Sequence, residues 1–142
     1  MSDSFVDFGS DMDGVQEPDL LPTKRYRLRI DNVKEQEKDG VKTGALFTIR
    51  ALDSGLDNPA PILHTVWYPK ADADETKRKN TLLFGKRFFF AFGISMSGGK
   101  VDLNSAIGKE ADMNVKLSTY TKNDGTEGKK NELDLPPLPK GV

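Results

Sequence analysis

Three arginines occupy alternate positions near residue 25. Arg25, Arg27 and Arg29 are separated by single apolar residues. In an extended strand, side chains two positions apart lie on one face about 6.6 to 6.8 Å apart, which is comparable with the phosphate spacing of an extended nucleic-acid strand. A guanidinium can both form a hydrogen-bonded fork on phosphate and stack on flat rings. The row therefore predicts a surface for a polyanion, and an ordinary solvated strand face is the alternative.

Other cations and aromatic residues lie on later segments that also read as strands. Single-stranded nucleic acid is bound without strong sequence preference by cations that follow the phosphates and by aromatic faces on which bases stack. Trp67 and Tyr68 are neighbours, so they point to opposite faces of a strand, and we expect Trp67 to face outward. The lysines around residues 122 to 130 would lie on a last hairpin, where an ordinary soluble turn is equally compatible. The predicted nucleic-acid-binding residues are Arg25, Arg27, Arg29, Arg50, Trp67, Lys116, Tyr120, Lys122, Lys129 and Lys130.

Catalytic chemistry finds little support in the residue types. The chain has one histidine, His64, and no cysteine, whereas nucleophilic and metal-assisted catalysis need clusters of such groups. The glycines from Gly93 to Gly99 suggest a phosphate-binding loop, but that motif requires lysine where Gly99 stands. We therefore expect a protein that is not an enzyme and that uses neither a metal nor a cofactor.

Charge divides the chain into an acidic arm and a basic body. Residues 1–22 carry six acids and no base, a charge of -6, while the remainder carries 21 bases against 22 - 6 = 16 acids, or +5. We expect three parts: a disordered acidic arm over 1–22, one domain over 23–135 and a proline-rich tail over 136–142. Phe5 and Phe8 in the arm are predicted to bind a partner. The arm could also occupy the domain's own binding surface as a mimic of nucleic acid, or serve only for solubility.

No segment approaches the roughly 18 to 20 consecutive apolar residues of a membrane span, and the first residues are acidic. Together with the absence of cysteine, this favours a protein of the cytoplasm.

Hydrophobic periodicity predicts five strands and one helix. Alternation favours strands over 25–33, 45–51, 62–68, 110–120 and 129–135, and the Asp39-Gly40 pair favours a tight turn between the first two. A helix is expected from Asp72 to Phe92, ended by Gly93. This order is that of a mainly β, OB-like five-stranded barrel with one helix between strands 3 and 4.

The expected helix is apolar nearly all round its axis. One small barrel does not readily cover such a helix, so we expect Phe84, Phe88 and Phe92 to mediate self-association into a homodimer. The alternative is that part of this segment forms a strand.

Short motifs in a fixed order carry a family resemblance. They are Leu21-Pro22 leading into Tyr26, Lys38 to Gly40, Ala91 to Gly93, Ile107 to Lys109, and Asn131. The chain resembles the phage OB-fold single-stranded-DNA-binding proteins encoded in recombination and replication modules. The resemblance implies sequence-tolerant binding that protects single-stranded DNA in the cytoplasm of a bacterial host, in the service of a phage recombinase or replisome protein and without a cofactor.

Two other functions remain compatible with the residues. A phage structural or assembly protein could use the same barrel only for protein contacts, through the cluster from Phe88 to Phe92. An accessory or inhibitor domain could mimic nucleic acid and bind a basic protein through residues 3–19.

Overall fold

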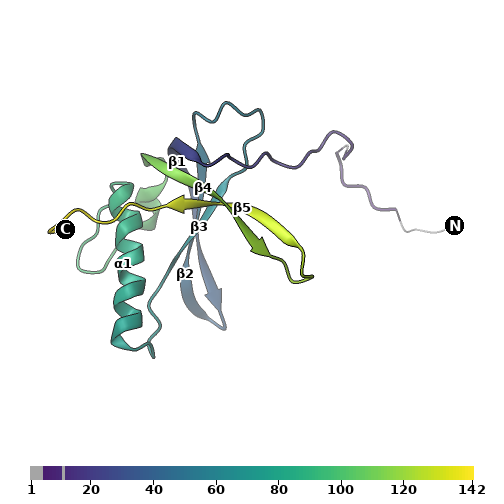
Figure 1. Cartoon of the computed structure of the whole chain (residues 1–142). Helices are drawn as coiled ribbons and strands as arrows, with labels where there is room; N and C mark the ends of the chain where they lie inside the picture. The colour runs from purple at the N-terminus through teal and green to yellow at the C-terminus, as the bar shows by residue number, and fades with distance from the viewer. Residues whose placement is uncertain (1–4, 11) are drawn as a thin grey trace.

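Five antiparallel strands form one strongly curved sheet in the computed structural model, which describes residues 5–10 and 12–142 (Figure 1). The sheet order is β3-β2-β1-β4-β5. The elements along the chain are β1 (Lys24–Lys38), β2 (Val41–Ala51), β3 (Ile62–Trp67), α1 (Glu75–Ala91), the short 3-10 helix η1 (Leu103–Ala106), β4 (Glu110–Thr121) and β5 (Glu127–Asp134). The mainly β fold with its helix between strands 3 and 4 is confirmed.

The sheet is OB-like, but it does not close into a complete barrel. β3 pairs with β2 and β5 pairs with β4. β3 and β5 contact each other, yet within the described residues no hydrogen-bonded ladder joins them. The predicted OB-like barrel is therefore an open one, with its gap between β3 and β5. A small pocket is lined by His64 and Thr65 of β3 together with Leu135, just beyond β5.

Alternation places the core as the sequence predicted. Tyr26, Leu28 and Ile30 of β1 are buried, and so are Phe47 and Ile49 of β2. Between the two strands, Asp39 and Gly40 both have positive φ, 54° and 78°. This is the two-residue hairpin turn whose twist matches that of paired strands, and it sets their register.

α1 covers the inner side of the sheet. The ring of Phe88 lies 4.6 Å from that of Phe47, and the ring of Phe89 lies 6.2 Å from it. Phe88 is 0% exposed and Phe92 only 2%, so the prediction that these two mediate self-association is wrong. The sheet curves around α1 and covers more of its apolar surface than we expected of one small barrel. Of the three predicted contact residues, only Phe84 is exposed, at 60%.

The predicted helix over 72–92 forms from Glu75 to Ala91, and no part of it is a strand. Asp74 caps its start by accepting the backbone N–H of Lys77 at 2.8 Å. Gly93, with φ 67°, follows its end. Gly85 lies inside the helix because it faces β3, where a Cβ would meet Val66 Cγ1 at 3.3 Å. Among the described residues, no helix is long and apolar enough to cross a membrane.

The last residues of the predicted arm belong to the domain. Leu21 is fully buried, and its backbone N–H and carbonyl both bond the side-chain amide of Asn131 in β5, at 2.9 and 2.8 Å. Asp19 is held by backbone hydrogen bonds to Asn58 and Ala60. The segment 1–22 is thus anchored from Asp19 onward, through contacts far apart in sequence that periodicity does not reveal.

Candidate nucleic-acid interface

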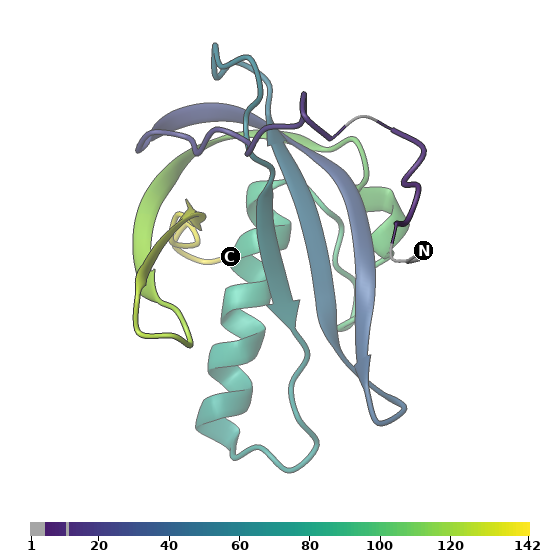
Figure 2. The same cartoon turned by 90° about the vertical axis from the view of Figure 1, so that its right-hand side faces the viewer.

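The outer face of β2 and β3 lies between two projecting hairpins. In Figure 2 it faces the viewer, with the β4–β5 hairpin (yellow-green) on one side, the β1–β2 hairpin (blue) on the other and α1 behind. In OB folds the face of strands 2 and 3, with the two hairpin loops beside it, is the surface that binds oligonucleotides. The strand register places two sets of side chains on this face, Leu46, Thr48 and Arg50 from β2 and Leu63, Thr65 and Trp67 from β3.

Trp67 is an exposed ring held by the strand beside it. It is 60% exposed, as its predicted outward orientation requires. It pairs with Gly44 of β2, and a Cβ on Gly44 would meet the Trp67 ring at 3.3 Å and the Val66 carbonyl oxygen at 2.8 Å. The missing side chain therefore lets the indole lie against the backbone of β2. A large ring fixed in this way can stack on a base with little loss of side-chain entropy.

Tyr68, the neighbour of Trp67, is instead tied to the sheet. Its hydroxyl donates to the Glu35 carboxylate at 3.1 Å. Burial, followed by the hydrogen bond and charge of Glu35, raises the pKa of Tyr68 to about 12. This contact joins the end of β3 to β1.

Tyr120 repeats the arrangement of Trp67 on the β4–β5 hairpin. It is 42% exposed and pairs with Gly128, where a Cβ would come within 2.6 Å of the tyrosine ring and 2.9 Å of Lys122 Cε. The Lys130 ammonium lies 5.6 Å from the centre of the ring. The hairpin thus carries an aromatic face bordered by two lysines, a combination suited to a base and its phosphates.

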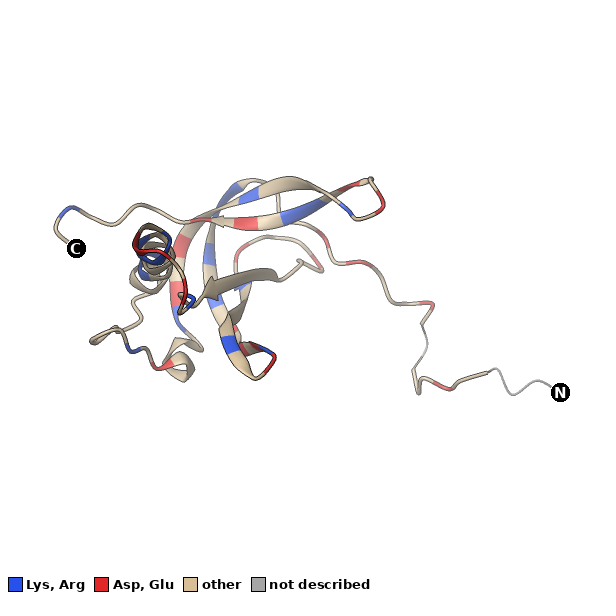
Figure 3. Cartoon of the chain, turned by 90° about the horizontal axis from the view of Figure 1, so that it is seen from below, with Lys and Arg blue, Asp and Glu red and all other residues tan. Residues whose placement is uncertain are grey.

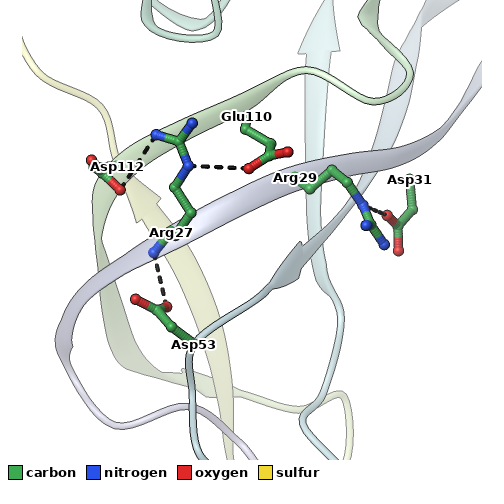
Figure 4. A network of polar contacts seen from close by, with 6 residues as sticks. All are labelled: Arg27, Arg29, Asp31, Asp53, Glu110 and Asp112. Carbon is green, nitrogen blue, oxygen red and sulfur yellow. Dashed lines mark hydrogen bonds and ion pairs between the residues drawn. The ribbon is translucent and has the colours of Figure 1, made fainter.

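The arginine row of β1 is not the free cationic stripe that the sequence predicted (Figure 4). Arg27 pairs through Nε with Glu110 at 3.2 Å and through a terminal nitrogen with Asp112 at 3.5 Å. Arg29 pairs through Nε with Asp31 at 2.8 Å. The two carboxylates on Arg27 come from β4, which the pairing of β1 with β4 places beside it. Much of the charge of the row is therefore neutralised within the sheet.

Asp31 joins two of the predicted arginines. The β1–β2 register shifts between Ile30 and Asn32, so Asp31 is an extra residue opposite β2. Its two carboxylate oxygens bind Arg29 at 2.8 Å and Arg50 at 3.0 Å. Through these two ion pairs, the extra residue Asp31 links Arg29 of β1 to Arg50 of β2. No local sequence pattern predicted this shift in register.

The remaining predicted cations divide into two groups. Lys116 pairs with Asp134 at 3.4 Å, and Lys130 pairs with Glu132 at 3.1 Å. The hydrogen bond from Lys130 is the largest cause of a lowered pKa at Glu132. Arg25, Lys122 and Lys129 have no ion pair within the described residues, so they are the predicted cations most available to phosphate.

The predicted partner residues Phe5 and Phe8 are 93% and 70% exposed. The segment ahead of Asp19, which contains both residues, leads away from the sheet (Figure 1).

Sequence reasoning missed a basic surface on α1 (Figure 3). The helix carries five bases against the single acid Glu75, a charge of +4, and the bases are Lys77, Arg78, Lys79, Lys86 and Arg87. The sequence signal for this surface is the two basic runs 77–79 and 86–87, which flank the apolar residues of the helix.

His64, the one histidine, packs in the interior. Its ring stacks on Phe88 at 4.8 Å between ring centres, and burial lowers its pKa from the usual 6.5. It is a packing residue, as its place among apolar neighbours favoured.

Comparison with known sequences adds nothing to this geometry, since no protein-family model and no curated protein matches the chain.

Proposed function

We propose that this protein binds single-stranded DNA with little sequence preference, across the outer face of β2 and β3 and along the β4–β5 hairpin. The observation that carries the proposal is the pair of exposed aromatic rings, Trp67 and Tyr120, each lying against a glycine of the adjacent strand on an OB-like sheet.

The binding mode combines stacking with phosphate contacts. Bases stack on Trp67 and Tyr120, and stacking tolerates any sequence because every base has a flat face. Phosphates contact Arg25, Lys122 and Lys129 first, since these cations have no competing carboxylate within 4.0 Å in the described chain. Arg27, Arg29, Arg50, Lys116 and Lys130 contribute less, because each must loosen an ion pair to reach a phosphate.

The biological setting is proposed from the resemblance to phage single-stranded-DNA-binding proteins. Such a protein would protect single strands during phage replication or recombination and would pass them to a recombinase or replisome protein. The alternative of a purely structural protein relied on the cluster from Phe88 to Phe92 as its interface, and the burial of Phe88 and Phe92 removes the main part of that surface.

A salt-titrated binding measurement tests the proposal directly. Labelled oligo(dT) should bind tightly, and a duplex of equal length should bind far more weakly. The slope of log K against log salt should be about -2 to -3, which is three to four phosphate contacts at about 0.7 each. Equal affinity for the duplex, or no binding to oligo(dT) at low salt, would show that the proposed face does not bind single strands.

A further inference from the structure

A groove of about 1110 Å³ runs beside α1, where the helix faces the end of β3 and the loop before β4. We name it the α1 groove. Most of its lining is apolar, although two lysines border it. Its lining includes Trp67, Leu82, Lys86, Phe89, Lys100 and Leu103. A groove of this size and character holds a ligand with large apolar groups.

The charges bordering the α1 groove favour an acidic ligand. Lys86 and Lys100 make no ion pair within the described part of the chain. Two carboxylates also border the groove, but both are engaged. Glu35 binds Lys42 at 3.3 Å and the Tyr68 hydroxyl, and Asp102 accepts the backbone N–H of Asn104 at 3.2 Å. With the +4 charge of α1 beside it, the groove suits a segment that combines apolar side chains with acids.

The N-terminal arm of this same chain has that composition. Phe5, Val6 and Phe8 are all strongly exposed, although large apolar side chains usually find cover. Asp7 lies between them, and the segment 1–22 contains six acids and no base. The arm thus pairs aromatic groups for the apolar lining with carboxylates for Lys86 and Lys100.

The position of the arm favours the groove of a different copy. In Figure 1, α1 lies at one end of the molecule and the arm leaves from the other, and Figure 3 agrees. The arm is anchored at Asp19 and Leu21, so residues 5–18 extend beyond the anchor. Fully extended at about 3.3 Å per residue, these residues span roughly 46 Å, more than the width of a domain of this size. The arm can therefore cross the gap to a neighbour.

We propose that residues 5–10 of one copy bind in the α1 groove of a second copy, with Phe5 and Phe8 in the apolar part and Asp7 near Lys86 and Lys100. Because the arm and the groove are different surfaces on opposite ends, each copy can accept one neighbour and donate to another. Such a head-to-tail contact joins successive copies into a ring or an open chain, according to the rotation between neighbours.

Mixing two defective variants tests this arrangement without any nucleic acid, so its outcome is independent of the proposed function. The arm variant is Phe5→Ala with Phe8→Ala. The groove variant is Leu82→Glu with Lys86→Glu, both on α1, where Leu82 is half exposed. Matched controls are Val15→Ala, an exposed arm residue outside the segment, and Leu83→Glu, an exposed helix residue that does not line the groove.

Sedimentation velocity over micromolar to near-millimolar protein is the measurement. The unmodified chain and both controls should show a mass that rises with concentration and falls with added salt. The arm variant should associate at least about tenfold more weakly, since this is the effect of losing even one buried phenylalanine. The groove variant should also weaken association, because it places two carboxylates where the acidic arm would bind. An equal mixture of the two variants should form a dimer and nothing larger, because only one intact arm and one intact groove can meet.

Three outcomes would overturn the proposal. A concentration-independent monomer mass for the unmodified chain, whether the arm is unbound or folded onto its own groove, would exclude docking between copies. Unchanged association of the arm variant would assign the contact to another surface. A mixture that does not associate would exclude the head-to-tail geometry.

If the groove variant unfolds early in a thermal scan, Lys100→Glu, outside the helix, takes its place. Loss of oligo(dT) binding in the groove variant, with no self-association of the unmodified chain, would assign the groove to nucleic acid instead.

Discussion

At the scale of the residue, the proposed interface depends on glycines as much as on aromatic side chains. Gly44 and Gly128 leave space for the rings of Trp67 and Tyr120, and any Cβ there would collide with its neighbours. A glycine inside a strand usually weakens it. Here the two glycines position flat, exposed rings that the strands would otherwise push away.

Replacing Trp67 by alanine should weaken oligo(dT) binding by about 1 to 3 kcal/mol, the contribution of one stacked base. Because the ring is more exposed than buried, the free energy of unfolding should change by less than about 1 kcal/mol. Fluorescence anisotropy and urea unfolding measure the two quantities. Leu63→Ala, an exposed residue on the same strand and face, is the control, and an equal loss of affinity there would remove the special role of Trp67.

His64 should make folding stability depend on pH near neutrality. Burial lowers its folded pKa below the unfolded value of 6.5, so the unfolded state binds more protons and stability falls as pH drops below about 6.5. The slope reaches at most about 1.4 kcal/mol per pH unit. Urea unfolding between about pH 7.5 and pH 5.5, above the range of ordinary carboxylates, should show this loss, and His64→Phe should abolish it. A slope that survives the substitution would place the titrating group elsewhere.

At the scale of the element, β1 and β4 share a network of charges that limits what the arginine row can do. Arg27 reaches Glu110 and Asp112 across the β1–β4 ladder, and Arg29 shares Asp31 with Arg50. These exposed pairs contribute little to stability. Under the proposed function, they would compete with phosphate for the arginines.

Two matched double variants separate paired from unpaired cations. Arg25→Gln with Lys122→Gln should flatten the salt slope of oligo(dT) binding by about 1.4, or about 0.7 for each lost phosphate contact. Arg27→Gln with Arg29→Gln removes the same formal charge but should flatten it by clearly less, since carboxylates already neutralise these arginines. Equal flattening by the two variants would mean that the ion pairs open freely on binding.

At the scale of the whole molecule, the acidic arm and the basic domain meet at a defined boundary. Residues 1–18 hold five acids and no base, so without them the charge changes from -1 to -1 + 5 = +4. Residues 19–22 lie on the domain, since Leu21 is buried against Asn131. The acidic arm that extends beyond the domain is therefore shorter than its composition indicated.

Two truncations should behave differently because of this boundary. Removal of 1–18 should leave stability unchanged and should tighten binding to a short oligo(dT), most clearly at low salt, where the attraction between arm and domain is least screened. Removal of 1–21 should also cost more than about 2 kcal/mol of stability, from the lost burial of leucine and the orphaned amide of Asn131. Urea unfolding and anisotropy titrations measure both effects. Equal stability of the two truncated chains would contradict the anchoring role of Leu21.

The features that depend on local periodicity could be predicted from the residues alone. The alternation in β1 and β2 identified the core face, Asp39-Gly40 identified the first turn, and Gly93 identified the end of α1. These signals work because neighbouring residues alone decide which face of a strand or helix is apolar and where the backbone turns. The order of the elements followed, and with it the OB-like fold.

The tertiary structure alone decided which distant residues meet. Arg27 and Glu110 are 83 positions apart, and Leu21 and Asn131 are 110 apart, so their partnerships exist only once the strands are neighbours. The burial of Phe88 and Phe92 likewise depends on how far the sheet curves around α1. The sequence therefore indicated the residue types of the interface, while the availability of each charge and ring was decided by packing between strands remote in the chain.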